Sequence, residues 1–179
     1  MSTIKTNQIQ TVAGKPILNS TGSILQVVTT TFTSTFSWST KNSWVDMTGI
    51  SATITPSSNS SKILVQVMLS TGDGGNNYER TYRVARGGTA IVEGPSVANI
   101  MVRSSFATGM GSYASNACTV TIPYIYLDSP ASTSALTYQL QGWASNASVT
   151  TSYINQPYAP STNTSPTGIS TMLLMEISG

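Results

Sequence analysis

The feature of this sequence that most constrains its fold is a two-residue alternation of apolar and polar side chains, which recurs along almost all of its 179 residues. Val, Ile, Leu, Tyr and Phe alternate with Ser, Thr and Gln in short runs, and clusters of Gly, Pro, Asn and Ser separate the runs. This alternation is typical of β-strands, and the spacing of an amphipathic helix is nearly absent. Strands are therefore expected at residues 23–28, 29–39, 44–47, 50–55, 62–70, 78–86, 89–93, 98–103, 117–127, 135–143, 149–154 and 170–177.

Several of these runs can join, so the expected architecture is an all-β fold, an antiparallel β-sandwich or jelly roll of about nine to eleven strands. Gly87-Gly88 separates two alternating runs and predicts a tight hairpin. Pro123 interrupts a long run and predicts an edge strand or a bulge there. The apolar strands at the two ends of the domain are expected to pair with each other. No repeat of fixed period is visible, which argues against propellers and solenoids.

The first 22 residues differ from the rest and are expected to form an extended N-terminal arm, with residues 23–179 as the sandwich domain. Isolated apolar residues stand among Lys, Thr, Asn and Gln, and Gly14-Lys15-Pro16 breaks any helix. Such a segment has too little apolar surface to fold alone, so we expect it to become ordered on another surface and serve for attachment. Its expected assembly residues are Ile4, Ile9, Val12, Ile17 and Leu18.

The charge content narrows the range of functions. The chain has eight Lys and Arg, six Asp and Glu, and no His, so histidine-based nucleophiles and histidine-ligated zinc are excluded. The sequence predicts no catalytic residue, no cofactor and no metal site, and we expect the protein not to be an enzyme. Scattered lysines argue against a nucleic-acid partner, and no apolar run is long enough to span a membrane. The start of the chain lacks the apolar segment of a signal peptide.

One group of aromatic and basic residues is a candidate recognition surface for glycans or protein carboxylates. On a strand, Arg80 and Arg86 share one face and Arg83 lies on the other. The alternative is that these arginines form ordinary strand ion pairs with Glu79 and Glu93. The candidate surface residues are Tyr78, Arg80, Tyr82, Arg86 and Trp143.

Three further features have both a functional and a structural interpretation. The tryptophans Trp38, Trp44 and Trp143 could stack on sugars, but large aromatic residues in a sheet protein more often belong to the core or an interface. The loop at residues 73–77 offers oxygen ligands for calcium, but a single carboxylate favours a solvated loop. The single cysteine, Cys118, is expected to be a small buried strand residue.

Taken together, several segments of the chain resemble short virion structural proteins of tailed bacteriophages of aquatic and cyanobacterial hosts. Such proteins are similar in strand content to trimeric jelly-roll knobs of the tumour-necrosis-factor and C1q type. The resemblance implies a homotrimer displayed on the virus particle, although no long shaft precedes the domain. The segments are MSTIKTNQIQ, GKPILNSTGSILQVV, SWVDMTGISATITPSS, KILVQVML, YRVARGGTAI and STMLLMEI.

This resemblance and the arm favour a capsid decoration or cement protein, made in the host cytoplasm and located in the virion. Its expected partners are copies of itself and the major capsid protein. The first alternative is a short tail fibre or receptor-binding knob, whose partners are a tail or baseplate protein and a host surface glycan. The second alternative is a soluble carbohydrate-binding module.

Overall fold

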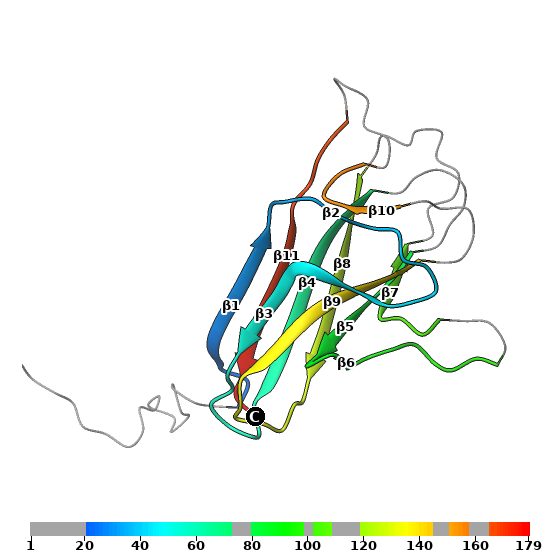
Figure 1. The fold of residues 1–179 in the computed structure, drawn as a ribbon. Helices are drawn as coiled ribbons and strands as arrows, with labels where there is room; N and C mark the ends of the chain where they lie inside the picture. Colours follow the sequence, from blue (N-terminus) through cyan, green and yellow to red (C-terminus); the bar gives the residue numbers. More distant parts are fainter. Residues whose placement is uncertain (1–20, 73–79, 99–101, 109–118, 145–150, 158–164) are drawn as a thin grey trace, which may run out of the picture.

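The computed structural model describes residues 21–72, 80–98, 102–108, 119–144, 151–157 and 165–179, and in these ranges it contains eleven strands and no helix. All strand pairs are antiparallel, and the strands form two sheets that lie against each other (Figure 1). The prediction of an all-β sandwich is therefore confirmed. The first sheet contains β1 (Ile24–Phe32), β11 (Ser170–Ile177), β4 (Lys62–Gly72), β8 (Thr119–Asp128), β10 (Ser152–Ile154) and β2 (Phe36–Trp38). The second contains β3 (Val45–Ile54), β9 (Leu136–Ala144), β5 (Arg80–Arg86), β6 (Thr89–Ala90) and β7 (Phe106–Thr108).

The order of the main strands is that of a jelly roll. With the three short strands β2, β6 and β10 set aside, one sheet has the order β1-β11-β4-β8 and the other has the order β3-β9-β5-β7. Successive main strands along the chain thus alternate between the sheets, except for β5 and β7, which pair within one sheet, and the strands wrap the sandwich as two Greek keys do. The first and last strands pair from Ile24↔Ile177 to Phe32↔Ser170, as the sequence predicts.

The core lies between the sheets and follows from the alternation. In β4 the residues Ile63, Val65, Val67 and Leu69 point inward and are fully buried. They pack in one cluster with inward residues of β11, β5 and β9. Each such aliphatic side chain contributes about 1.5–3 kcal/mol to folding through its removal from water.

Aromatic side chains extend this core along the sandwich. Tyr82 contacts Trp38 edge-on at 6.5 Å between ring centroids and stacks on Phe106 at 5.3 Å, and Phe106 stacks on Tyr124 at 4.8 Å. Trp38 is buried among these rings, so the core interpretation of this tryptophan is confirmed.

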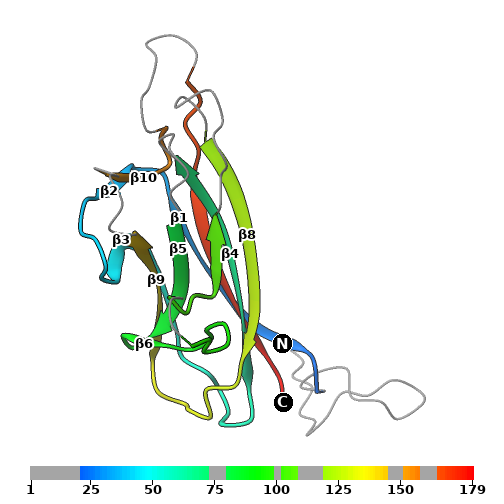
Figure 2. The same ribbon diagram turned by 90° about the vertical axis from the view of Figure 1, so that its right-hand side faces the viewer.

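The local predictions from turns and prolines are confirmed where the structure describes them. Gly87 and Gly88 form the two-residue turn of a hairpin, with φ angles of 56° and 82° and with Arg86 paired to Thr89. Pro123 lies in β8, which pairs with β4 alone within the described part of the chain and runs along one edge of its sheet (Figure 2).

Some strand boundaries differ from the prediction. The runs at 44–47 and 50–55 join into β3, which is irregular between Asp46 and Ser51, where Gly49 has a φ of 93°. The strand expected at 98–103 is wrong for residues 98, 102 and 103, and residues 99–101 lie outside the described residues. In the stretch that is described, Arg103 Nε donates to the carbonyl of Gly94, and Gly94 N–H donates to the carbonyl of Ser104. The strand of this region is β7, which begins at Phe106.

Candidate functional site

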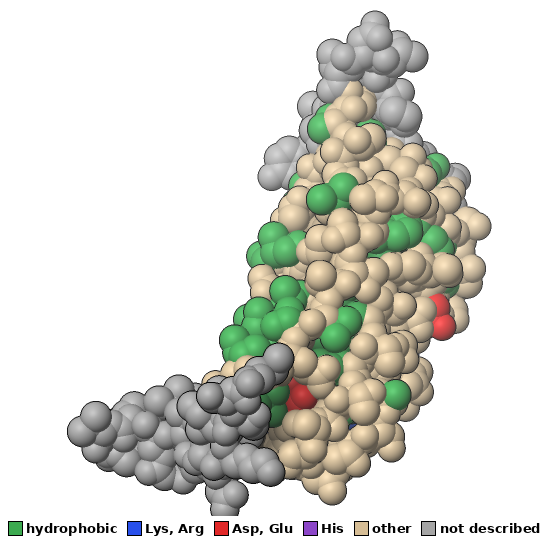
Figure 3. Space-filling model, turned by 90° about the vertical axis from the view of Figure 1, so that its left-hand side faces the viewer, with side chains coloured by type: hydrophobic (Ala, Val, Ile, Leu, Met, Phe, Trp, Pro, Cys, Tyr) green, Lys and Arg blue, Asp and Glu red, His purple; other side chains and the backbone are tan. Residues whose placement is uncertain are grey.

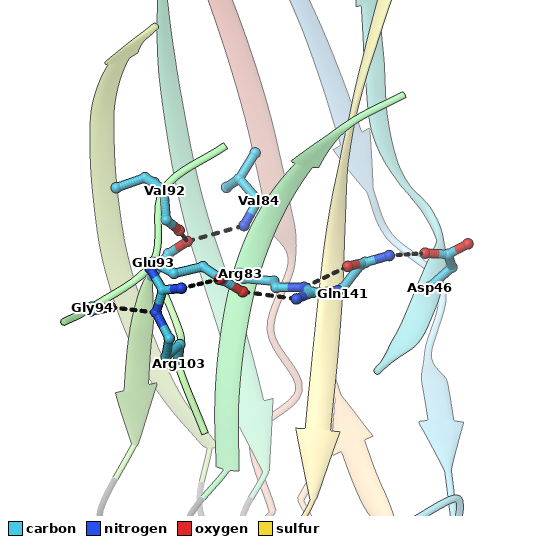
Figure 4. A network of polar contacts seen from close by, with 9 residues as sticks. Asp46, Arg83, Val84, Val92, Glu93, Gly94, Arg103 and Gln141 are labelled. Carbon is cyan, nitrogen blue, oxygen red and sulfur yellow. Dashed lines mark hydrogen bonds and ion pairs between the residues drawn. The ribbon is translucent and has the colours of Figure 1, made fainter. Parts of the chain in front are cut away.

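The outer face of the second sheet carries a network of polar side chains that we call the Arg83 network: Asp46, Arg83, Glu93, Arg103 and Gln141. The register places Gln141 of β9 between Asp46 of β3 and Arg83 of β5. Gln141 Nε2 donates to Asp46 Oδ1 at 2.7 Å, and Arg83 Nε donates to Gln141 Oε1 at 2.7 Å (Figure 4). Arg83 also pairs with Glu93 at 2.7 Å, and Arg103 lies 3.7 Å from the same carboxylate.

Two half-buried tryptophans accompany this network. The guanidinium carbon of Arg83 lies 4.1 Å from the centre of the Trp44 ring, which is a cation–π contact. Trp143 is two residues from Gln141 on β9, so its side chain lies on the same outer face. This face therefore combines aromatic surface with hydrogen-bonding groups, the combination that saccharide sites use, although its charges already neutralise one another.

The predicted aromatic-basic surface is wrong for Arg80 and Tyr82. The two do share one face of β5, but that face is the inner one, and both side chains are fully buried. Tyr82 Oη lies 2.8 Å from Thr71 Oγ1, and Arg80 Nε donates to Ser152 Oγ at 2.7 Å. Tyr82 fits this inner face because its ring packs in the aromatic core. Glu79 and Tyr78 lie outside the described residues.

Arg86 also belongs to a structural cluster, so it is not an open recognition group. It forms an ion pair with Asp128 at the end of β8, and Tyr138 Oη donates to Asp128 Oδ2 at 2.7 Å. Burial alone lowers the pKa of Arg86, but the hydrogen bond and charge of Asp128 reverse this, and the pKa is raised. Burial and the bond to Asp128 raise the pKa of the Tyr138 phenol. The cluster joins the two sheets at one end of the sandwich.

The alternative interpretation, in which the arginines of this strand form ion pairs with Glu79 and Glu93, holds for Arg83. Its partner Glu93 is described by the structure, whereas Glu79 is not. Arg83 pairs with Glu93, and Trp143 is half-buried on the face opposite to that of Arg80. The sequence predicted the pairing with Glu93 as an alternative, but the links from Arg83 through Gln141 to Asp46 depend on the register of β5, β9 and β3 and were not predicted. The inward position of apolar Val84 could have indicated which face of β5 is outside.

Glu176 forms a second polar cluster that the sequence did not reveal. It is fully buried and points inward from β11. Its Oε1 accepts hydrogen bonds from the backbone N–H and Oγ of Ser57 at 2.7 and 2.6 Å and from Ser61 Oγ at 2.6 Å, and its Oε2 accepts one from Gln26 Nε2 at 2.6 Å. Burial alone raises its pKa, but these bonds outweigh burial and hold the pKa at about 2.

The outer face of the first sheet is apolar, and we call it the apolar face. Apolar side chains point outward from all four long strands of this sheet, β1, β11, β4 and β8. Figure 3 shows hydrophobic side chains gathered on the side of the molecule that β1 borders. Among exposed large hydrophobic residues, Ile24, Val27, Ile125 and Leu127 belong to this face. The face is defined by Ile24, Val27, Leu64, Gln66, Met68, Ile125, Leu127, Leu173, Met175 and Ile177.

Within the described ranges, no group of three or more Cys, Asp or Glu side chains could hold a metal ion. No helix in that part of the chain is long and apolar enough to cross a membrane. The expected arm residues Ile4, Ile9, Val12, Ile17 and Leu18 lie outside the described residues, as do Cys118 and the loop at 73–77.

No protein-family model matches the sequence, and no curated protein matches it. Fourteen chains of solved structures match the fold. One is a chain in the structure of infectious bursal disease virus, Gx strain, with 18% sequence identity and a TM-score of 0.44. The match covers 86% of this chain and 32% of the viral chain, so the present chain spans about a third of the length of that match.

Proposed function

We propose that this chain is a non-enzymatic virion structural protein, a homotrimeric decoration or cement protein of a bacteriophage capsid. The observation that carries the proposal is the apolar face, which extends over four neighbouring strands of a jelly roll. A face of this kind marks a protein that works by binding to another protein surface. The resemblance of the sequence to phage virion proteins supplies the kind of particle.

The polar groups of the described residues support a structural role. Arg83, Arg86, Glu93, Asp128 and Glu176 all form ion pairs or hydrogen bonds within the fold. Catalytic acids and bases have to be presented to a substrate with a free lone pair or proton. In this protein the same groups join strands and sheets, which favours a rigid building block over an enzyme.

The proposed anchor is the arm, residues 1–22. The backbone N–H of Gly22 donates to the carbonyl of Ser178, and Ser178 N–H donates to the carbonyl of Ser23. Gly22 and Ser23 therefore lie beside the end of β11. We propose that the arm binds the major capsid protein by adding to a sheet edge or by lying between coat subunits.

A second candidate is a short tail fibre or receptor-binding knob that binds a host surface glycan. The observation that favours it is the pair Trp44 and Trp143 beside Arg83, because aromatic rings with nearby hydrogen-bonding groups suit sugar binding. The same surface would serve a soluble carbohydrate-binding module. Binding of purified protein to a glycan array, lost in a W44A/W143A variant, would favour these candidates over a cement protein.

The test of the proposed function is binding of the full-length chain to virus particles. A variant with Ile4, Ile9 and Ile17 replaced by Asp should keep its fold and lose co-sedimentation with capsids that lack the protein. The matched control replaces Thr3, Thr6 and Thr11 by Asp, which adds the same charge at polar positions of the arm. Equal binding by both variants would contradict the anchor. A copy number in purified virions that matches the tail proteins and not the coat protein would contradict the capsid location.

A further inference from the structure

The apolar face is built from rows of side chains that cross the first sheet. The register aligns Leu127, Leu64, Met175 and Val27 in one row across β8, β4, β11 and β1. The next row is formed by Ile125, Gln66, Leu173 and Thr29. At the end of the sheet, Ile177 pairs with Ile24. The face is therefore continuous from one edge strand to the other.

The composition of β4 and β11 indicates that this face is covered in the working protein. Ile63, Val65 and Val67 fill the core, yet Leu64 and Met68 on the opposite side of β4 are apolar as well. In β11 the outward residues are also apolar, except for Thr171. Strands that are apolar on both sides are typical of sheets that are covered on both faces. In the single chain one of these faces is open.

The charge on the face suits contact with an identical face. Among the strand residues that point outward here, Lys62 at one end of β4 is the charged one, and no carboxylate is present in these strands on this side. Lys62 is paired with Ile177 at the end of the sheet, so two such faces can meet over the remaining rows without burying an uncompensated charge, whose desolvation would oppose binding. A partner of strong charge would gain no complementary ion pair from this surface.

The size of the face agrees with a contact between subunits. Four strands about 4.8 Å apart and six residues of about 3.4 Å each give about 400 Å² per copy. In a head-to-tail contact each copy presents one part of its face to each neighbour, so one contact covers about 400 Å² of these faces and a closed ring of three covers about 1,200 Å². One such contact is smaller than the roughly 1,000 Å² of a specific interface, so the ring depends on all three contacts closing together.

Large apolar side chains are exposed at both edges of the face, Ile24 and Val27 on β1 and Ile125 and Leu127 on β8. The β8 side also has a hollow of about 270 Å³, lined by Gln66, Pro123, Tyr124 and Ile125. When the exposed side chains of the β1 edge of one copy enter the hollow of the next, the contact is head-to-tail, and such contacts close into a ring when the rotation between copies returns to the first copy.

From these observations we infer that copies of this chain meet through the apolar face, with the β1 edge of one copy against the β8 side of the next. The inference rests on the proposed trimeric building block and names the surface that forms it. It leaves the Arg83 network on the outside of the ring, because that network lies on the other sheet.

The test compares two valines with the same exposure. Val27 belongs to the apolar face, and Val97 lies in a loop outside the strands of both sheets. Each of the two side chains is 53% exposed. The variants Val27→Glu and Val97→Glu therefore add the same charge in place of the same side chain. Mass is measured by sedimentation over a range of protein concentrations, and capsid binding is measured in parallel.

We expect wild type and Val97→Glu to have three times the mass of the chain, and Val27→Glu to have the mass of one chain. The buried charge should weaken association by about 100-fold or more. Should Val27→Glu fail to fold by circular dichroism, Ile125→Glu at the other edge provides the same test. Without any substitution, the sulfur of Met175 should be protected from oxidation in the assembled protein and become reactive on dilution.

The outcomes separate this inference from the proposed function. A trimeric Val27→Glu with a trimeric Ile125→Glu would overturn the assigned face, while capsid binding would still decide the function. A wild-type protein that is monomeric at every concentration, and whose Val27→Glu variant loses capsid binding, would overturn self-association and assign the face to a coat protein. Trimers that never bind particles would support the face and contradict the virion role.

Discussion

Replacement of Glu176 by Gln tests how strongly one buried carboxylate stabilises the fold. The carboxylate accepts four hydrogen bonds, three of them on one oxygen. An amide has one oxygen and one NH2 group, and the NH2 group cannot accept. If the new NH2 group takes the place of Oε2, it faces the NH2 group of Gln26, and two donors then oppose each other. The Gln26 amide cannot rotate to present its oxygen instead, because its NH2 group also donates to the carbonyl of Thr55 at 2.7 Å.

The pKa gives the size of the effect. Folding lowers the pKa of Glu176 from 4.5 to about 2, which corresponds to about 3 kcal/mol in favour of the ionised, folded state at neutral pH. The amide retains part of the hydrogen bonding, so we expect Glu176→Gln to lower the free energy of unfolding by about 2–3 kcal/mol at pH 7. Urea denaturation at fixed protein concentration measures this difference.

The pH dependence gives a second, independent result. Because the pKa is lower in the folded state, the stabilisation from Glu176 is complete above pH 4.5 and is lost as the pH falls toward 2. Wild type should therefore lose more stability than Glu176→Gln between pH 5 and pH 2, in the range of about 2–3 kcal/mol. Asp46→Asn is the control, since Asp46 is exposed and its loss should change stability by less than about 1 kcal/mol. A constant difference between wild type and Glu176→Gln at all pH values would refute this reasoning.

Two further substitutions test the outer network and the backbone. Arg83→Met removes its hydrogen bonds and ion pair and its contact with Trp44, so we expect a loss of about 1–2 kcal/mol in stability and a change in tryptophan fluorescence; an unchanged spectrum would contradict the contact. Gly49→Ala should destabilise the fold by about 2–3 kcal/mol in thermal or urea unfolding, because φ is 93° and a Cβ would lie 2.6 Å from a ring carbon of Phe32. Gly88→Ala, also at positive φ but with open space around it, should lose less, and equal losses would show that the Phe32 contact is unimportant.

Much of the fold could be predicted because its information is local. Alternation identifies the strands at 62–70 and 170–177, and Gly87-Gly88 identifies a turn without knowledge of the rest of the chain. The pairing of the first and last strands was predictable because both are apolar and end the domain. Strand boundaries near Gly49 were less predictable, since Gly49 has a positive φ and the register of β3 against β9 shifts between Asp46 and Ser51, which the alternation does not reveal.

The candidate surface could not be predicted in the same way. Both faces of β5 carry arginine, so the charges do not say which face is buried, and apolar Val84 is the signal in this strand that favours the Arg80 face as the inner one. The partners of the inner face decide this, and Thr71 and Ser152 reach Tyr82 and Arg80 from other strands. Glu176 was missed for the same reason, because its hydrogen-bond donors Gln26, Ser57 and Ser61 are all more than one hundred residues away in the chain.

The apolar face shows how the two kinds of information combine. From sequence alone, the strands at 62–70 and 170–177 are expected, and both runs are rich in apolar residues. The structure shows that one side of each strand is in the core and that the other side, although apolar, is open to solvent in the single chain. A contact with another subunit would cover this open apolar side.

The central claim, that this chain is a building block of a virus particle, is tested most directly by a cryo-electron microscopy map of the particle that contains it. We expect jelly-roll density in groups of three on the capsid, with the apolar face between copies and the arm in contact with coat protein. Particles whose map and protein content lack the chain would contradict the claim, and so would copies on the particle whose apolar faces point into solvent.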